Sequence, residues 1–516
     1  MNTMKRLFCM LLVLAMCLGA LVACQRPEND PKETDENTTD DGEGTKDDDS
    51  DSTSDSLAAD LISGLEDNYQ FADTTLPYRI LSRSSTTYEF ESAAGLEGTA
   101  VEAAIFSRNE EVMERCGVEI TVVPTAGDWG ARDDFMAVVR NNGNLTTGEY
   151  ELVATHSAYL MNLAVEGLGW DFNELPNLDL TKRWWSEAFY NTANYNGAQY
   201  ISFGDIAYTL YSYMLVVFFN SQMAEDLNIE EDFYDLALDG DWTFAKLKEY
   251  TAKVTTNLDA PADTREYAFL TNGHSVRNIT GGFEADLIPK NSEGKREVKI
   301  LMPANLEAVF QEIADYVQDN KQVYYSGLGE NGAGDENDIF AAGRALFYTQ
   351  MLGQATYFKG TMKEEYGVMP FPKYNDQQKN YHTGFRDTMT AILVPFNVGN
   401  TEMVGTVTEM LSEVSYWEVT SEYYEETLKY QSFNDPKCVA TLELIRKSVD
   451  PTFALVYSNC MGTCNSMLSN LIESNLSKGA DGSVSSAYVN SSGNWRQYLK
   501  DLYEDLDAIA AARAGA

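Results

Sequence analysis

The chain has 516 residues and a formal net charge of −43, from 80 acidic and 37 basic residues. A surface this acidic is repelled by phosphate backbones and anionic lipid, so the composition argues against a nucleic-acid partner and against a basic membrane-binding face. Roughly 450 residues remain beyond the first 60, which by size alone is enough for two or three domains with a large buried core.

The first residues have the pattern of an export signal. Lys5 and Arg6 precede an apolar run over residues 7–20, which is too short to span a bilayer comfortably, and small residues follow. The sequence Leu-Val-Ala-Cys at residues 21–24 resembles the bacterial lipobox, in which the cysteine becomes the lipidated first residue. We expect residues 1–23 to be a signal peptide and Cys24 to carry lipid, palmitate included; a plain secreted protein is the alternative.

Residues 24–60 comprise this cysteine and a segment that is rich in Asp, Glu, Ser and Thr and almost free of large apolar side chains. Such a composition cannot build a core, and it predicts a disordered acidic linker that holds a globular body away from a surface. Calcium binding is the alternative for its carboxylates, but no ordered pattern of alternating ligands is present. We therefore expect a lipid-anchored protein on the extracellular side of the cell membrane, or on the periplasmic side in a Gram-negative cell.

Cys9 and Cys17 leave with the signal peptide, so four cysteines remain in the body: Cys116, Cys438, Cys460 and Cys464. A disulfide is permitted outside the cell, and a bond from Cys438 to Cys460 or Cys464 is the favoured pairing because these residues share one late segment. Buried free thiols are the alternative. Zinc is disfavoured because no histidine or second cysteine pair lies nearby.

Beyond the linker the chain alternates between extended apolar runs and helical periodicity, which predicts an α/β fold. In chain order we expect a strand at 78–81, a helix at 99–116 closed by Gly117, a strand at 118–123 stopped by Pro124, a helix at 133–140 and a strand at 150–155 that turns into another helix. This order is typical of a parallel sheet with crossover helices.

Ligands collect beyond the carboxyl ends of such strands. The segments there are 82–85, 125–129 and 155–157, and they contribute Ser84, His156 and Ser157 as candidate ligand-binding residues. Routine turn and helix-cap roles are the alternative for these side chains. No G-x-G-x-x-G or G-x-x-x-x-G-K-[ST] occurs at these turns, which argues against dinucleotide and P-loop chemistry.

Several motifs further along the chain resemble one protein family. Residues 195–201 read Tyr-Asn-Gly-Ala-Gln-Tyr-Ile, residues 215–223 form an apolar run that ends in Asn-Ser-Gln-Met, and residues 241–244 read Asp-Trp-Thr-Phe. In this order they resemble passages of the extracellular solute-binding proteins of bacterial ABC importers. Thr243 is also placed to cap a helix over residues 244–254, with Trp242 stapling the entering chain.

Three more matches follow in the family's order, at residues 343–349, 366–372 and 389–395. Trp184-Trp185 with Gly204-Asp205, and residues 450–453, resemble a lipoprotein subgroup of carbohydrate importers from low-GC Gram-positive bacteria. The chain departs from many sugar binders at residues 350–353, where Gln-Met-Leu-Gly replaces a motif with a stacking tryptophan.

The resemblance implies a two-lobed, periplasmic-binding-protein-like fold, with each lobe a mainly parallel sheet flanked by helices and with hinge strands between discontinuous lobes. We expect lobe 1 to comprise residues 61–203 and 364–400, and lobe 2 residues 204–363 and 401–516. The first crossing is expected at residues 199–206 and the return near residues 366–372. A solute bound between the lobes favours the closed state only through its extra affinity for that state.

The resemblance further implies a solute, most plausibly a sugar or oligosaccharide, that is passed to the ABC transporter permease. Aromatic rings stack on sugar faces, and carboxylates, amides and guanidinium groups bind hydroxyls. The candidates of these types are Trp184, Trp185, Asp205, Tyr208, Tyr213, Tyr348, Gln350, Arg386 and Asp387. The alternatives are buried lobe anchors for Trp184 and Trp185, packing beside the hinge for Tyr213, and a surface ion pair for Arg386 with Asp387.

We expect a monomer that needs no cofactor or metal and is not an enzyme. Two alternatives stay open: an exported glycoside hydrolase that uses paired carboxylates, and a surface glycan-binding lipoprotein without a transport role. The three histidines, His156, His274 and His382, form no H-E-x-x-H motif, and neither G-x-S-x-G nor a Ser/His/Asp arrangement is visible.

Overall fold

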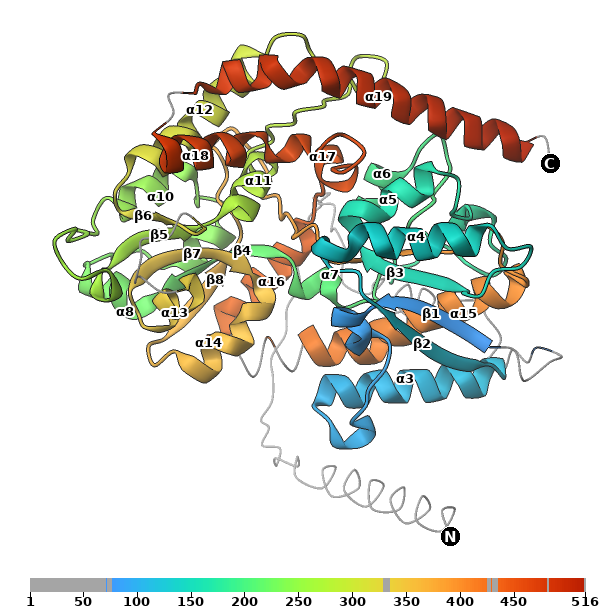
Figure 1. The fold of residues 1–516 in the computed structure, drawn as a ribbon. Helices are drawn as coiled ribbons and strands as arrows, with labels where there is room; N and C mark the ends of the chain where they lie inside the picture. The colour runs from blue at the N-terminus through green and yellow to red at the C-terminus, as the bar shows by residue number, and fades with distance from the viewer. Residues whose placement is uncertain are drawn as a thin grey trace, which may run out of the picture. The chain divides into compact units, whose positions relative to one another are not determined.

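The computed structural model describes residue 71 and residues 77–327, 335–424, 428, 435–479 and 482–514. The predicted signal peptide, the lipidated Cys24 and the acidic linker lie outside these residues. The helices and strands named below belong to the described part of the chain (Figure 1).

The first sheet has the strand order β2-β1-β3-β9. Its strands are β1 (Pro77–Arg83), β2 (Glu119–Thr125), β3 (Leu152–His156) and β9 (Thr390–Leu393). β1 pairs in parallel with β2 and β3, and β9 runs antiparallel to β3. Helices α3 (Ala100–Cys116) and α4 (Arg132–Gly143) connect the parallel strands, which confirms the predicted strand–helix–strand–helix–strand order.

Local sequence sets the ends of α3. The Thr99 hydroxyl accepts from the backbone N–H of Glu102, and the Glu102 carboxylate accepts from the backbone N–H of Thr99, so a capping box opens the helix. Gly117 closes it in the left-handed region, with φ of 64°, where a side chain is disfavoured.

Pro124 does not stop the second strand as predicted, because β2 runs on to Thr125. β2 is the edge strand of the first sheet, so one of its sides has no neighbouring strand. A proline, which lacks the backbone N–H, is tolerated at such an edge.

The second sheet has the strand order β6-β5-β7-β4-β8. Its strands are β4 (Leu215–Asn220), β5 (Tyr267–Thr271), β6 (Val323–Tyr325), β7 (Ala345–Met351) and β8 (Tyr366–Met369). β5 runs parallel to β6 and β7, whereas β4 runs antiparallel to β7 and β8. The predicted mainly parallel layout thus holds for four strands of this sheet, β5, β6, β7 and β8, and only β4 runs in the opposite direction among the described strands.

Helices cover both sheets, in an α/β arrangement that matches the predicted fold class. The others are α5 (Ser157–Val165), α6 (Glu187–Ala193), α7 (Thr209–Ser212), α8 (Ser221–Asp226), α9 (Phe233–Leu238), α10 (Phe244–Thr251), α11 (Gly273–Gly282), α12 (Ala304–Asp319), α13 (Glu336–Ala341), α14 (Ala355–Thr361), α15 (Thr401–Val414), α16 (Pro436–Lys447), α17 (Phe453–Val456), α18 (Met467–Lys478) and α19 (Val484–Ala514). Thr243 caps α10 as predicted, because its side chain accepts from the backbone N–H of Lys246.

Two neighbouring segments connect the sheets. One runs from Ser202 to Met214, just before β4. Ser202 forms a bridge with Ile392 of β9, and Met214 forms a bridge with Phe385. The other returns from β8 through Phe385 to β9. The crossings therefore lie nearer to residues 203–214 and 383–389 than to the predicted 199–206 and 366–372.

Two elements, β8 and α15, belong to a different sheet from the one that the expected lobe boundaries assign them to. β8 was expected in lobe 1, but it hydrogen-bonds to β4 in the second sheet, where its apolar side chains are buried. α15 was expected in lobe 2, but it packs on α3 and shares the hydrophobic core of the first sheet through residues such as Val404 and Val407. Pairing partners distant in sequence, which local patterns do not reveal, decide both placements.

The four described cysteines are free thiols, so neither favoured disulfide is present. Cys116, Cys438 and Cys464 are buried, as in the alternative considered above. Among the described helices, none combines the length and the apolar character that crossing a membrane requires.

Candidate functional site

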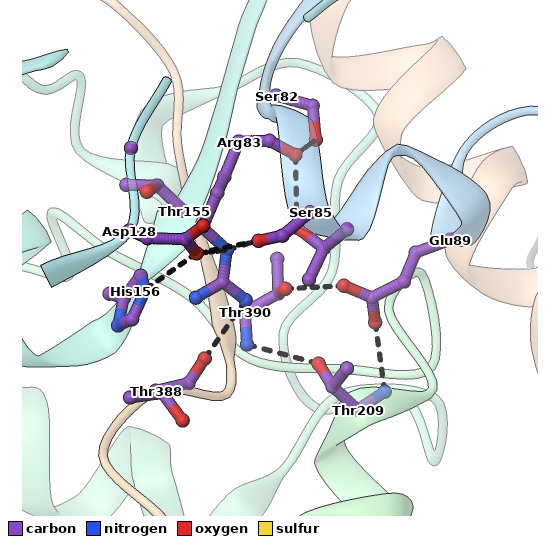
Figure 2. A network of polar contacts seen from close by, with 12 residues as sticks. Ser82, Arg83, Ser85, Glu89, Asp128, Thr155, His156, Thr209, Thr388 and Thr390 are labelled. Carbon is purple, nitrogen blue, oxygen red and sulfur yellow. Dashed lines mark hydrogen bonds and ion pairs between the residues drawn. The ribbon is translucent and has the colours of Figure 1, made fainter. Parts of the chain in front are cut away.

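Polar side chains gather where β1, β2 and β3 end (Figure 2). Ser85 follows β1, and its hydroxyl donates a hydrogen bond of 2.6 Å to Oδ1 of Asp128, in the loop after β2. The same oxygen lies 3.9 Å from Nε of Arg83 and 3.7 Å from Nε2 of His156. We call these four residues, Arg83, Ser85, Asp128 and His156, the strand-end cluster. The hydrogen bond from Ser85, with help from Arg83, holds the pKa of Asp128 below its usual value.

His156 is 3% exposed, yet neither ring nitrogen has a hydrogen-bond partner among the described residues. Its ring stacks on Tyr159, with 5.4 Å between the ring centroids. Burial, and then the charge of Arg83, lower the pKa of His156 to about 3, so the ring is neutral near pH 7. A neutral imidazole has one donor and one acceptor nitrogen, which suits it to the hydroxyl groups of a polyol.

Arg83 joins the first sheet to the segment that returns from the second. Its Nη2 donates to the backbone carbonyl of Thr388 at 3.0 Å, and its Nε donates to the hydroxyl of Thr86 at 3.3 Å. Hydrogen bonds from a charged donor contribute about 1.5–3 kcal/mol each. The guanidinium thus fixes residue 388 beside the strand-end cluster.

Glu89 ties both crossing segments together in the same region (Figure 2). One carboxylate oxygen accepts from the backbone N–H of Thr209 at 2.8 Å, and the other accepts from the hydroxyl of Thr390. The backbone N–H of Thr390 in turn donates to the hydroxyl of Thr209 at 3.0 Å. Burial raises the pKa of Glu89, although these donors oppose the shift.

The second sheet contributes His274 and Arg277 from α11, which begins directly after β5. Nδ1 of His274 and Nη1 of Arg277 each lie 3.9 Å from a carboxylate oxygen of Asp387. The backbone carbonyl of Asp387 accepts from the hydroxyl of Ser157, at the start of α5, at 2.9 Å. Asp387 therefore links elements of the two sheets. Burial raises its pKa, and the neighbouring cations oppose the shift.

Arg386 lies among residues of both sheets. Its backbone N–H donates to the carbonyl of Tyr213 at 2.9 Å. Burial lowers the pKa of His156 and of His274, and the charge of Arg386 lowers both further. Burial raises the pKa of Tyr348, and the charge of Arg386 opposes this rise. The pKa of His274 falls to about 3, so this imidazole is neutral as well.

Tyr348 and Gln350 are adjacent on one face of β7, and both are buried. The tyrosine hydroxyl donates to Oδ1 of Asn337 at 3.0 Å and accepts from Nε2 of Gln350 at 2.6 Å. This chain of hydrogen bonds orients the amide and the phenol beside Arg386.

A group of tyrosine rings lies along the crossing segments. The ring of Tyr208 is 5.7 Å from that of Tyr88 and 5.0 Å from that of Tyr423, measured between centroids. Tyr88 is 38% exposed, so it presents ring surface to solvent next to the buried Glu89. Exposed aromatic rings of this kind can stack on sugar faces.

The structure does not bring Trp184, Trp185 and Asp205 to this region. Trp184 is fully buried and Trp185 is 5% exposed, and both indoles donate to Glu409 in the core of the first sheet. Asp205 accepts from the hydroxyls of Tyr211 at 2.8 Å and Thr420 at 2.6 Å. Burial raises the pKa of Asp205 to about 6.

Trp185 and Asp205 do line a separate cavity of about 500 Å³, together with Arg183, Tyr211 and Arg446. Its walls come from α6, α7 and the end of α16. None of the residues of the strand-end cluster borders this cavity.

Of the remaining sequence candidates, His156, Ser157, Arg386 and Asp387 come together, with Tyr348 and Gln350 beside them, whereas Ser84 is exposed at the end of β1. Arg83, Asp128, His274 and Arg277 were not singled out. Arg83 and Asp128 fall within the predicted strand-end segments, and His274 follows β5 at the same kind of position. Applying the strand-end rule to the second sheet would have found His274.

Among the described residues, no group of three or more His, Cys, Asp or Glu side chains has the geometry of a metal site. The candidate site consists of hydrogen-bond donors and acceptors from both sheets.

No protein-family model and no curated protein matches the chain. Solved structures do. The ABC substrate-binding protein Lmo0181 from Listeria monocytogenes, in complex with cycloalternan, is 14% identical with a TM-score of 0.54, and the match covers 83% of this chain and all of that one. The GacH receptor of Streptomyces glaucescens, solved unliganded and with acarbose, is 15% identical with a TM-score of 0.52, covering 83% and 99% of the two chains.

UgpB from Mycobacterium tuberculosis, in complex with glycerophosphocholine, is 12% identical with a TM-score of 0.56, covering 83% of this chain and 98% of that one. At these identities the likeness concerns the fold. The chain has the two-lobed α/β fold of ABC substrate-binding proteins, as its sequence motifs predicted.

Proposed function

We propose that the protein is an extracellular solute-binding protein that captures a sugar or oligosaccharide between two lobes and delivers it to the permease of an ABC importer. The observation that carries the proposal is the meeting of Asp387 with both sheets, through Ser157 on one side and through His274 and Arg277 on the other. A solute placed there contacts both lobes and so favours their closure.

The chemistry of the site supports a saccharide. His156, Gln350 and Arg386 offer hydrogen-bond donors and acceptors, and Tyr88 offers an exposed ring beside Tyr208 on one of the crossing segments. Sugar sites combine these two kinds of group. The solved relatives hold cycloalternan and acarbose, while glycerophosphocholine in UgpB shows that the same fold also accommodates a polyol phosphodiester.

We further propose that Cys24 anchors the protein to the outer face of the cell membrane through lipid and that the acidic linker spans the distance to the body. The lipobox-like sequence and the linker composition support this anchor. We expect the protein to act as a monomer and to perform no catalysis, in keeping with relatives that are binding proteins.

A thermal-shift screen of the body from residue 57 onward, against mono- and oligosaccharides and short peptides, tests the proposal. A ligand at a hundred times its dissociation constant stabilises the folded state by about 2.7 kcal/mol, which gives a measurable shift. We expect stabilisation by one class of saccharide, with the saccharide recovered unchanged. Shortened oligosaccharide would replace the proposal by a glycoside hydrolase, and stabilisation by peptides alone would remove the sugar assignment.

A pair of variants locates the site. Gln350→Ala should lower the affinity for the saccharide found in the screen, because it removes a buried amide at the proposed site. Gln222→Ala is the matched control, since Gln222 lies on α8 and bonds only to the exposed Asp226. Equal losses in both variants would place the site elsewhere.

A further inference from the structure

Arg386 is held in place by its own backbone. Its N–H donates to the carbonyl of Tyr213 at 2.9 Å, and its carbonyl accepts from the N–H of Met389 at 3.0 Å. These bonds fix the residue on the segment that returns to the first sheet. Its charge acts on His156, His274 and Tyr348, which come from β3, α11 and β7, so the guanidinium lies near all three elements.

Among the described residues, the guanidinium of Arg386 has no counter-ion in contact with it. In the described part of the chain, no carboxylate lies within ion-pair distance of it, and its buried Nε has no hydrogen-bond partner. Arg386 is half-buried, and its buried Nε has lost its hydration without gaining a partner, which is unfavourable.

The carboxylates of the candidate site already have other partners. Asp387 faces His274 and Arg277, at 3.9 Å each. Asp128 accepts from Ser85 at 2.6 Å, with Arg83 at 3.9 Å. Because both carboxylates interact with other residues, neither one serves as the counter-ion of Arg386.

A third carboxylate, that of Glu336, acts on Tyr348 through its charge and accepts from the hydroxyl of Ser326 at 2.6 Å. The two histidines nearby are neutral near pH 7, so they neither neutralise the charge of Arg386 nor add to it. His156 adds two buried nitrogens that also lack partners.

We propose that the solute is a saccharide that carries a monoanionic group and that Arg386 binds this group, with His156 bonding an adjacent hydroxyl. The proposal rests on the proposed function and specifies its substrate class. One guanidinium without a counter-ion matches one negative charge, and its planar fork fits a carboxylate or a sulfate ester with two parallel hydrogen bonds. Binding of the anion would give the buried Nε a hydrogen-bond partner and neutralise the charge of the guanidinium.

Two sources supply such a group: the carboxylate of a uronic acid and the sulfate ester of a sulfated sugar. Isothermal titration of the body from residue 57 onward against trigalacturonate, its methyl ester, a sulfated galactose disaccharide and the same disaccharide without sulfate separates them. The methyl ester keeps the shape of the uronate and removes its charge. We expect at least one charged sugar to bind ten times more tightly than its neutral counterpart.

Salt provides a second readout. Attraction between the solute anion and Arg386 is weakened by added ions, whereas hydrogen bonds to neutral hydroxyls are not. The affinity for the charged sugar should therefore fall between 50 and 500 mM NaCl by roughly threefold or more, and the affinity for the neutral counterpart should stay constant.

Arg386→Gln tests the residue. The variant should bind the charged sugar no more tightly than the neutral one, and Arg386→Lys should restore part of the preference. Arg140→Gln is the matched control, because Arg140 is paired with Glu166 at 2.6 Å on α4, away from the site. The melting temperature of Arg386→Gln should equal or exceed that of the parent protein, since the change removes a half-buried charge whose Nε has no hydrogen-bond partner among the described residues.

The outcomes separate the two proposals. If neutral and charged counterparts bind equally, or if Arg386→Gln keeps the preference, the monoanion is wrong while saccharide capture stands. If no saccharide binds, both proposals fail. If Arg386→Gln melts well below the parent protein, Arg386 has a structural role instead.

Discussion

The carboxylate of Glu409 accepts hydrogen bonds from two consecutive indoles, from Nε1 of Trp184 at 3.1 Å and from Nε1 of Trp185 at 2.9 Å. Glu409 lies on α15, and the tryptophans precede α6. This contact joins α15 to the core of the first sheet, and it explains why the two tryptophans are buried instead of facing a solute.

Trp184→Ala should destabilise the protein without weakening solute binding. Truncating a fully buried tryptophan costs about 3–5 kcal/mol, because it leaves a cavity and, here, one fewer donor for Glu409. Urea unfolding measures the loss. Trp417→Ala is the control, since Trp417 is 42% exposed and should change stability by about 0.5 kcal/mol or less. Weaker saccharide binding with unchanged stability would instead assign Trp184 to the ligand.

Glu409 should make stability depend on pH. Burial raises its pKa to about 8 in the folded state, above the usual value of a glutamate, so between pH 5 and 8 the folded state holds a proton that the unfolded state has lost. Stability then falls as the pH rises through this range. Compared with Glu409→Gln, which cannot titrate, the parent protein should lose stability between pH 5 and pH 8 in urea titrations. A constant difference between the two proteins would contradict the raised pKa.

Thr390→Val should destabilise the connection between the sheets by about 1–3 kcal/mol, because it leaves the buried Glu89 one hydrogen bond short. Thr388→Val is the matched control, since only the backbone carbonyl of Thr388 is used by Arg83. Chemical unfolding of both variants gives the comparison. Equal stabilities would mean that the hydroxyl of Thr390 contributes nothing to the folded state.

His274→Ala should lower the affinity for the solute by about 0.5–1.5 kcal/mol, the usual contribution of one hydrogen bond. His382→Ala serves as the control, because His382 lies between Glu284 at 3.0 Å and Asp450 at 2.7 Å, outside the candidate site. Isothermal titration with the saccharide from the screen measures both. A loss of affinity in His382→Ala alone would show that the solute binds elsewhere, near His382.

Cys24→Ala should release the protein into the medium or leave an uncleaved precursor, because the lipobox-like sequence then has no thiol to accept lipid. Cell fractionation and labelling with a radioactive fatty acid detect the change. Cys116→Ala is the control, since Cys116 is buried in the body. A Cys24→Ala protein that still incorporates the fatty acid would refute the anchor.

Much of the fold followed from periodicity and from helix caps. β1, α3, α4 and β3 were predicted because their apolar spacing and their turns are local features of the sequence. The end of β2 was not, since only its position at the sheet edge makes Pro124 acceptable. The placements of β8 and α15 depend on partners far along the chain, which periodicity does not identify.

The site was predictable in part for the same reason. The strand-end rule pointed to His156 and Ser157, and the position before β9 pointed to Arg386 and Asp387. Local sequence patterns could not show that the indole N–H groups of Trp184 and Trp185 have an acceptor in the core. That acceptor, Glu409, lies on a helix more than two hundred residues further along the chain.

Helix α19 has contacts beside both sheets. It packs on α12 and α18, where the hydroxyl of Tyr488 donates to the carbonyl of Lys299 at 3.1 Å, and further along on α5, where Asp507 accepts from Tyr195 at 2.8 Å (Figure 1). A continuous helix of 31 residues is about 46 Å long and resists bending. Gly493, about a third of the way along it, is a weak point because glycine has a low helix propensity. Any rotation of one sheet against the other must therefore break or shift one of these contacts or bend the helix near Gly493. The helix α19 thus limits how far the two halves can separate.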